Sequence, residues 1–453
     1  MKIVNVKIVH ILSLLVSVVL ITSCHHNEPD VNPEAAKLRQ ALEAIELFSR
    51  IEADPDTTAV RLKAEGEIDY IAQYSMFFTQ DLDHTEEGGE SFQQRVCIIF
   101  RGFDRPTVLV TEGYDWLDFG DAEDLGINLN ANMVHVEHRN YGESYNSDRW
   151  HWQYQTIAQA SADLHAVYQT LKPLFPGKWL SAGTSKSGET SIAYAYLYPQ
   201  DMNLAVSFCG PFVIGLNDKR FGQYLFNEVS TEENRELMKT AIRKALQGGE
   251  DGFYTEICRR QAEEQEWVPG FSEYVFNLFD TFFQVFQFTP HNEQKEILEV
   301  LADDDEELIE MVRAIVTENR DELYYAYFVE CAKEQGITDN GYEYFSDLLD
   351  GTSFDPNEAG VLLDPEDYWL TSTYDGTIYT NIVNDFFINS TVPLLLIYSH
   401  DDPWSAGQPT TVGPMVKKII NPIGVHSPFL NDPDFCPPSV KEEAMDFVNT
   451  YIQ

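Results

Sequence analysis

A serine in the first half of the chain stands where a nucleophile could be held. Ser185 lies in Gly183-Thr184-Ser185-Lys186-Ser187-Gly188, between a short apolar run at 179–182 and a helical pattern of apolar residues that begins directly afterwards. A serine in such a strand-turn-helix junction is held in a strained backbone conformation, with its hydroxyl projecting from the sheet edge and small residues beside it. Ser185 is therefore the candidate nucleophile. The alternative is a turn of small residues without a catalytic role.

The turn matches two known motifs incompletely. The pattern G-x-S-x-G accounts for Gly183 and Ser185, but Ser187 occupies the place of its last glycine. A phosphate-binding loop would need a lysine directly after Gly188 to reach the phosphates, and the sequence has Glu189 there. Because the charge of Glu189 would repel phosphate groups, the sequence argues against nucleotide binding.

An acid and a base follow Ser185 in the order that a serine hydrolase requires. Asp401 and Asp402 come directly after an apolar run at 392–399, and His426 comes after the next turn. Nucleophile, acid and base in this chain order are typical of α/β-hydrolases. The imidazole takes the proton of the weakly nucleophilic hydroxyl, and the carboxylate orients the imidazole and stabilises its charged form. Asp402 is the preferred acid, and spacing alone leaves Asp401 open.

The same chemistry needs donors for the oxyanion that forms during acyl transfer. In this fold the first donor is the backbone N–H of the residue after the nucleophile, here Lys186. The second comes from the loop after an earlier strand, most naturally from Gly113 or Tyr114, and a glycine lets the backbone approach the substrate closely. Loss of one such donor raises the barrier by about 3 kcal/mol.

The expected strands and helices place these residues along one edge of a sheet. Nearly continuous apolar runs predict buried strands at 107–111, 132–136, 179–182, 204–208 and 392–399. Their alternation with helical patterns favours a mostly parallel α/β sheet with its site at the carboxyl ends of the strands. The other expected elements are a helix at 34–51, an edge hairpin of strands at 74–80 and 92–100, and helices at 157–171 and 441–451.

A long insertion interrupts this alternation at 213–389. The segment is acidic and helical in pattern, and its crowd of phenylalanines at 276–288 is more typical of core packing than of a binding surface. The acidic run at 303–307 suits the start of a helix, where the helix dipole favours negative charge. We expect a helical cap at 213–389, inserted between a first core segment at 34–212 and a second at 390–453.

The start of the chain carries a predicted export signal. Lys2 and Lys7 precede an apolar run, and an apolar residue and small residues lead into Cys24, as at a lipoprotein processing site. A retained transmembrane helix is disfavoured, because the apolar run is short and polar residues follow it directly. The sequence therefore predicts a signal peptide at 1–23, lipidation of Cys24 and a tether at 24–33. We expect an envelope lipoprotein, periplasmic or surface-exposed, held in the membrane by its lipid anchor.

Charge and cysteine content exclude several classes of protein. The formal net charge of −44 opposes binding to nucleic acid and to anionic membrane surfaces, since both require clustered Lys and Arg, and it mildly favours cationic ligands such as peptide amines. The cysteines beyond Cys24 have no zinc-site spacing, so no metal and no cofactor are expected. The sequence leaves open whether Cys258 and Cys331 form a disulfide.

Four groups of residues follow one another along the chain: Glu137 to Ser144 (EHRNYGES), Gly183 to Gly188 (GTSKSG), Asp402-Pro403-Trp404-Ser405 and Gly424-Val425-His426. Together and in this order they resemble the secreted bacterial tripeptidyl aminopeptidase family of serine peptidases. Further likeness lies in Gln80 to His84, Phe92 to Arg95, Arg105-Pro106 and Glu112-Gly113-Tyr114. A more distant resemblance is to lysosomal prolyl carboxypeptidase and its dipeptidyl peptidase relative. The likeness covers most of the chain outside the predicted signal peptide and cap.

The resemblance implies an α/β-hydrolase core with a helical cap and a triad of Ser185, Asp402 and His426. It also favours Asp402 over Asp401, because the family places the triad acid in its Asp-Pro-Trp motif. The implied activity is the release of short peptides, expected to be tripeptides, from free amino termini through an acyl-enzyme. Ser187 departs from the family, which usually has glycine there, and could narrow the site or mark a divergent substrate.

An aminopeptidase must also hold a protonated amine at a fixed distance from its nucleophile. Glu112, Glu137 and Glu143 fall at the predicted catalytic edge and are the candidates, while acids of the cap could serve equally. Glu137 could instead form a structural ion pair with Arg139 or another base. Two alternative functions remain open at this level: an esterase or other acyl hydrolase on the same fold, and a non-catalytic lipoprotein that binds peptides.

Overall fold

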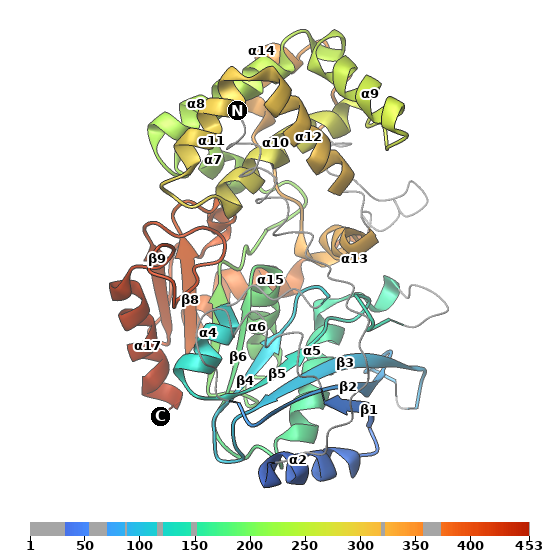
Figure 1. Ribbon diagram of the computed structural model, residues 1–453, viewed down its shortest axis with the longest axis vertical. Coiled ribbons are helices and arrows are strands. Elements are labelled where there is room, and N and C mark those ends of the chain that lie inside the picture. Colours follow the sequence, from blue (N-terminus) through green and yellow to red (C-terminus); the bar gives the residue numbers. More distant parts are fainter. Residues whose placement is uncertain are drawn as a thin grey trace.

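The computed structural model describes residues 32–53, 70–86, 88–115, 121–145, 152–318, 322–356 and 373–452. The predicted signal peptide, Cys24 and nearly all of the predicted tether lie outside these residues. Within them, the strands form one sheet that carries helices on both faces, and a second, helical layer stands beyond one end of the sheet (Figure 1).

The sheet has nine strands in the order β1-β2-β3-β5-β4-β6-β7-β8-β9. The first four in this order pair antiparallel, and from β5 onward every pair is parallel. The strands are β1 (Phe48–Ala53), β2 (Ala72–Asp81), β3 (Ser91–Phe100), β4 (Thr107–Thr111), β5 (Asn132–Val136), β6 (Trp179–Thr184), β7 (Leu204–Phe208), β8 (Leu394–Ser399) and β9 (Val416–Asn421). The mostly parallel α/β sheet expected from the sequence is thereby confirmed.

Helices cover both faces of the parallel strands. On one face pack α2 (Pro33–Glu43), α5 (Ile157–Leu171) and α6 (Lys186–Leu197), and on the other pack α4 (Asp121–Asn128) and α17 (Pro438–Ile452). Strands β4 to β8 are buried along their whole length, which explains their nearly continuous apolar sequence. The carboxyl ends of these strands face the helical layer (Figure 1).

The amino-terminal prediction was wrong in part. A single helix was expected at 34–51, but α2 ends at Glu43 and residues 48–53 form the edge strand β1. Leu38 and Leu42 are buried as expected, whereas Phe48 pairs with Phe78 across the sheet, their rings 5.2 Å apart. The helical spacing continued past Glu43 by coincidence, and strand pairing with β2 decided the conformation. The predicted hairpin is present as β2 and β3, one strand in from the edge.

The inserted segment is helical, as predicted. Its main helices are α7 (Arg220–Asn227), α8 (Glu232–Leu246), α9 (Phe253–Glu264), α10 (Phe271–Phe288), α11 (Gln294–Asp303), α12 (Asp305–Glu318), α13 (Glu322–Glu330) and α14 (Ser346–Leu349). The crowded phenylalanines lie on α10, and most are buried in the apolar core that α7, α8, α10, α11 and α12 share. They are therefore core residues. The acidic run lies where it was expected, across the start of α12.

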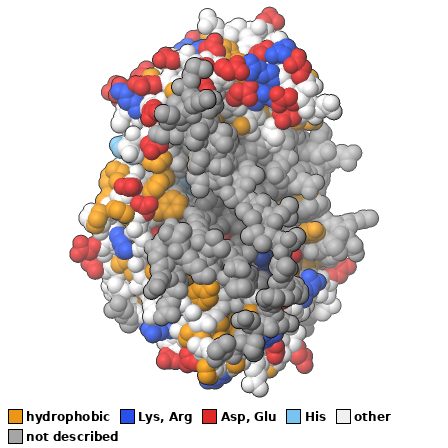
Figure 2. Space-filling view, viewed as in Figure 1, with side chains coloured by type: hydrophobic (Ala, Val, Ile, Leu, Met, Phe, Trp, Pro, Cys, Tyr) orange, Lys and Arg blue, Asp and Glu red, His pale blue; other side chains and the backbone are white. Residues whose placement is uncertain are grey.

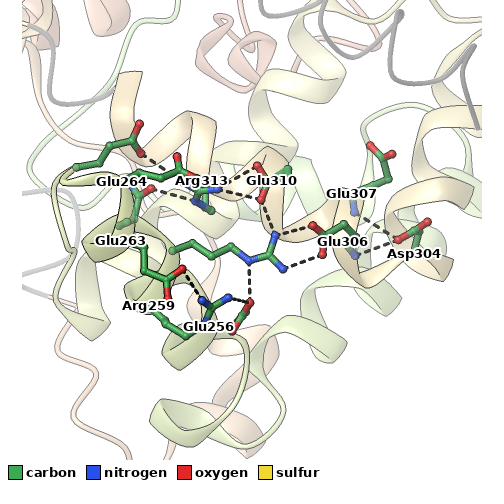
Figure 3. A network of polar contacts seen from close by, with 12 residues as sticks. Glu256, Arg259, Glu263, Glu264, Asp304, Glu306, Glu307, Glu310 and Arg313 are labelled. Carbon is green, nitrogen blue, oxygen red and sulfur yellow. Dashed lines mark hydrogen bonds and ion pairs between the residues drawn. The ribbon is translucent and has the colours of Figure 1, made fainter.

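Ion pairs cross the surface of this cap. Arg260 on α9 contacts Glu256 one turn away and Glu306 and Glu310 on α12. Arg313 contacts Glu264 and Glu310 (Figure 3). Acidic and basic side chains gather over this end of the molecule (Figure 2). Most of the glutamates are half-exposed, so each ion pair alone contributes little to stability. Several such pairs together help to hold α9 beside α12.

The end of the predicted insertion packs with the core. Helix α15 (Thr377–Asn381), a π-helical turn (Ile382–Phe386) and α16 (Phe387–Asn389) place Tyr379, Ile382 and Phe387 in the apolar cluster beneath the sheet, together with residues of α5 and α6. The insertion therefore returns to the core before β8 begins. The predicted boundary between residues 389 and 390 therefore lies shortly before β8 and does not separate cap from core.

Two further features concern the membrane and the thiols. Among the described helices, none combines the length and the apolar character needed to cross a bilayer. The five cysteines of the described residues are all free thiols, so Cys258 and Cys331 do not pair.

Candidate active site

The turn after β6 holds Ser185 in a strained conformation. Its φ of 59° and ψ of −130° lie in a region that residues with a side chain rarely adopt. Its N–H donates to the carbonyl of Phe208 at the end of β7 (2.8 Å), and α6 begins at the next residue. Such strain costs on the order of 1–3 kcal/mol, and it persists because the strand, the helix and the neighbouring strand all fix the turn. This is the geometry predicted for a nucleophile.

Ser187 is accommodated by the end of β4. Its hydroxyl donates to the carbonyl of Thr111 (2.6 Å), and the Thr111 hydroxyl donates back to the Ser187 carbonyl (2.9 Å). A Cβ atom at Gly183 would come within 1.9 Å of the Ser187 hydroxyl oxygen, so glycine is required there. Ser187, which departs from the family pattern, thus joins α6 to β4 through these two hydrogen bonds with Thr111.

The acid and the base lie together in the carboxyl-end loops of β8 and β9. Nδ1 of His426 is 3.0 Å from Oδ2 of Asp402, and both side chains are almost completely buried. The Ser405 hydroxyl and the Trp404 N–H also donate to Asp402, which fixes the carboxylate. Neither ring nitrogen of His426 makes a hydrogen bond of good geometry among the described residues, so Nδ1 meets Asp402 as a close contact of 3.0 Å and Nε2 makes no hydrogen bond with Ser185.

Asp401 contacts residues other than His426. Its carboxylate lies 2.9 Å from Nδ1 of His400 and also contacts Nδ1 of His291, which follows α10 of the cap. Gln294 of the cap donates to it at 3.3 Å. The two neighbouring acids therefore face different partners, and only Asp402 contacts His426.

The candidate oxyanion loop lies against the nucleophile turn. A Cβ atom at Gly113 would come 2.5 Å from the backbone nitrogen of Ser187 and 2.8 Å from the carbonyl carbon of Lys186. Only glycine permits this approach. The carbonyl of Tyr114 accepts from the N–H of His138 (3.1 Å), which ties the loop after β4 to the loop after β5.

The side chain of Lys186 enters a buried polar cluster. Its ammonium lies 3.1 Å from Glu330 Oε2 and within 6 Å of the ring centroids of Tyr114 and Tyr141. Burial alone would raise the pKa of Glu330, but the Lys186 charge, with His138, holds it below its usual value. Gln155 donates to the same carboxylate at 3.0 Å.

Two other acids of this cluster have raised pKa values, which favours their protonated, neutral form. Burial raises the pKa of Glu189 well above its usual value, and burial together with the charge of Glu330 raises that of Glu334 to about 8. Glu330 and Glu334 belong to α13 and the turn after it. Sequence reasoning left the acids of the cap unassigned, because no motif marks them. A stretch of nearly 150 residues also separates them from Lys186 along the chain.

The three acids proposed to bind a substrate amine have protein partners. Oε1 of Glu112 is 3.0 Å from Nδ1 of His135, and Glu143 is exposed beside Arg95, with 3.6 Å between the charged atoms. Glu137 accepts from the Glu143 N–H and the Ser144 hydroxyl (2.9 and 2.6 Å), and burial raises its pKa to about 7. The alternative ion pair with Arg139 does not form, because Arg139 contacts Asp163 instead.

One cysteine lies beside the acid and the base. The thiol of Cys209, which follows β7, is buried, and its sulfur, an Asp402 oxygen and a His426 nitrogen all lie within 4.8 Å of one another. Burial and the charge of Asp402 raise the pKa of this thiol well above its usual value. No cysteine spacing in the sequence indicated this position.

These features define the class of the protein. A mostly parallel sheet, a strained serine between strand and helix, and an acid and a histidine in the loops of the following strands constitute the α/β-hydrolase fold. Solved structures similar to this chain include an esterase from Thermogutta terrifontis (13% identical, TM-score 0.35, covering 83% of this chain and 99% of that one). Another is an α/β-hydrolase fold protein from Nakamurella multipartita (13%, TM-score 0.34, covering 78% and 94%).

Sequence comparison shows which family the chain resembles. Residues 32–251 match the model of the PS-10 peptidase S37 family. The chain is also 32% identical over 173 residues to the prolyl tri/tetrapeptidyl aminopeptidase of Streptomyces mobaraensis, a match that covers 38% of this chain and 36% of that relative. Over these residues the chain is similar to a family of serine peptidases, and the expected resemblance to tripeptidyl aminopeptidases is confirmed. The match spans about a third of the length of the curated relative.

Proposed function

We propose that the protein is a serine exopeptidase that releases short peptides, expected to be tripeptides, from free amino termini. The observation that carries the proposal is the contact of 3.0 Å between His426 Nδ1 and Asp402 Oδ2, with Nε2 left for a substrate-side partner. The strained turn at Ser185 supplies the nucleophile on the same edge of the sheet. The family match and the activity named for the Streptomyces relative support a peptide substrate.

The reaction follows from these roles. His426 Nε2 takes the proton of Ser185 as its hydroxyl oxygen attacks the scissile carbonyl, and Asp402 stabilises the imidazolium. The backbone N–H of Lys186 and one from Gly113 or Tyr114 donate to the oxyanion. Collapse breaks the amide bond, and the imidazolium protonates the leaving amine. Water, deprotonated by His426, then attacks the acyl-enzyme and releases the short peptide.

A substrate amine needs an acid that protein partners do not neutralise. Glu112 and Glu143 each form an ion pair with a histidine or an arginine, whereas Glu137 accepts hydrogen bonds from neutral donors in its own loop and is also influenced by the charge of Arg95. Glu137 is therefore the most favourable of the three sequence candidates. A bound ammonium would lower the pKa of Glu137 from its raised value and keep the carboxylate charged.

The test is the length and origin of the products. The purified protein is incubated with a peptide pool and with the same pool acetylated at its amino termini, and products are identified by mass spectrometry. Tripeptides released only from free amino termini support the proposal. Equal cleavage of the acetylated pool would replace the exopeptidase by an endopeptidase, and hydrolysis of esters alone would replace it by an esterase.

We also propose that the protein works in the cell envelope, anchored through a lipid on Cys24. The support is the apolar run after Lys2 and Lys7 that ends in small residues before Cys24. Metabolic labelling with a fatty acid should mark the wild type and leave Cys24→Ser unlabelled. Equal labelling of both proteins would contradict the anchor.

A further inference from the structure

Asp121 is a buried carboxylate that sequence reasoning did not single out. It is the first residue of α4 and is completely inaccessible to solvent. Three groups donate to it: the Thr184 hydroxyl to Oδ2 (2.7 Å), the Ser427 hydroxyl to Oδ2 (2.5 Å) and the Phe429 N–H to Oδ1 (2.7 Å). A buried carboxylate is costly unless it is hydrogen-bonded in this way.

Two of these partners adjoin candidate catalytic residues in the sequence. Thr184 directly precedes the candidate nucleophile Ser185, and Ser427 directly follows the candidate base His426. Both hydroxyls meet on the same oxygen atom of Asp121. One side chain thus connects two loops that carry the reacting groups and are otherwise positioned by different strands of the sheet.

Such a connection matters because acyl transfer depends on the distance between hydroxyl and imidazole. A displacement of about 1 Å can cost roughly 100-fold in rate even when it originates away from the reacting atoms. Ser185 and His426 share no hydrogen bond in this structure that could hold them together. Their relative position therefore depends on the groups behind them.

The ionisation of Asp121 is compatible with this role. Burial raises its pKa to about 7, while the hydrogen bonds from Ser427, Thr184 and Phe429 oppose that shift. The charged or titratable groups that face it are the carboxylate of Asp124 and the thiols of Cys209 and Cys436. The ionised form accepts from all three donors, so the bridge is complete when the carboxylate is charged.

A neighbouring acid provides a comparison within the same helix. Asp124 is also buried on α4, and it accepts from the N–H and the side-chain amide of Asn431 (2.9 and 2.6 Å). Asn431 adjoins no candidate catalytic residue. If buried acids of α4 only attach the 427–431 loop to the core, the two positions should be equivalent.

We propose that Asp121 is a positioning residue that sets the distance between the nucleophile Ser185 and the base His426 by bridging Thr184 and Ser427. The inference rests on the proposed function, because it requires these two residues to react. It assigns no contact with substrate to Asp121.

The experiment compares Asp121→Asn and Asp121→Ala with the matched variants Asp124→Asn and Asp124→Ala. For each protein the rate of labelling of Ser185 by a fluorophosphonate, kcat and KM for a tripeptide amide, and Tm are measured. The proposal predicts that Asp121→Ala lowers kcat and the labelling rate by roughly 100-fold, with KM within about twofold because substrate binding is unchanged. The Asp124 variants should lower Tm by a similar amount and keep kcat within about threefold.

Two milder variants keep the test decisive if the Asp121 variants do not fold. Thr184→Val and Ser427→Ala each remove one of the two hydroxyls, and each should lower kcat by roughly tenfold with KM unchanged. Equal losses of kcat at Asp121 and Asp124, or full activity of both hydroxyl variants, would overturn the proposal. If the wild-type protein is neither labelled nor active, the proposed function itself fails.

Discussion

Glu330 Oε2, carried by the inserted cap, lies 3.1 Å from the ammonium of Lys186, the residue directly after Ser185. Both side chains are almost completely buried, so the pair is a fixed part of the structure. The cap is therefore attached to the nucleophile turn by a desolvated charge pair as well as by apolar packing. This attachment makes the stability of the cap and the geometry of the turn depend on each other.

Breaking this pair should destabilise the protein. Lys186→Met leaves Glu330 without its main partner, and loss of one partner of a buried pair typically costs about 3–5 kcal/mol. The backbone N–H of Lys186 is retained, so kcat of the folded variant should stay within about tenfold of the wild type. Urea unfolding and steady-state kinetics measure the two effects.

The double variant Lys186→Met with Glu330→Gln is the control for this pair. Removing both charges should restore part of the lost stability, because no unpaired charge remains buried. A double variant that loses the sum of the two single losses would show that the contact is energetically irrelevant.

Gly113 should tolerate no side chain. In Gly113→Ala the new Cβ would collide with the backbone of Lys186 and Ser187, and the loop must move away from the nucleophile turn. Loss of an oxyanion donor predicts that kcat falls by about 100-fold or more. Gly270→Ala is the matched control, because a Cβ at Gly270 meets no atom within 4 Å, and it should keep wild-type kinetics. Wild-type kcat in Gly113→Ala would remove this loop from the oxyanion hole.

Glu137 should give the stability a defined pH dependence. Burial raises its pKa from 4.5 to about 7, so between these values the folded protein keeps a proton that the unfolded chain has released. This contribution to stability is present in full below pH 4.5 and is lost as the pH rises through 7. Relative to Glu137→Gln, the free energy of unfolding of the wild type should fall by about 3 kcal/mol across this range. The free energies of unfolding of both proteins are measured by urea titration at several pH values. The same dependence on pH in the two proteins would contradict the assignment.

The ion pairs between α9 and α12 should stabilise the cap weakly and in a salt-dependent manner. Arg260→Gln removes contacts with Glu306 and Glu310, whose side chains are largely exposed. The decrease in Tm should be small at low ionic strength and should disappear near 1 M NaCl, where the screening length is about 3 Å. A large decrease that persists in high salt would show that Arg260 acts through packing.

The sequence predicted the parts of the molecule in which local pattern and fold agree. The buried strands at 107–111, 132–136 and 204–208 have the expected bounds, because strands covered on both faces are apolar throughout. The contact between Asp402 and His426 was also foreseen, since chain order and local motif identify both residues. The preference for Asp402 agrees with the geometry, which gives Asp401 to His291 and His400.

Features set by tertiary contacts were not predictable in this way. The helix expected to reach residue 51 ends at Glu43 because β1 pairs with β2, and a hydrophobic period cannot report a pairing partner. Glu330 meets Lys186, and Asp121 meets Ser427, across long stretches of chain without a shared motif. The buried charges of Lys186 and Glu189, which are the charged residues of the helix after the nucleophile, were a local sign that polar partners must exist elsewhere.

The most direct test of the account is the turnover of one tripeptide amide by the wild type and by Ser185→Ala, with equal folded fractions verified by circular dichroism. If Ser185 is the nucleophile, the variant should lose activity by at least about 10³-fold and keep its Tm. Turnover of the variant equal to that of the wild type would contradict the proposed chemistry.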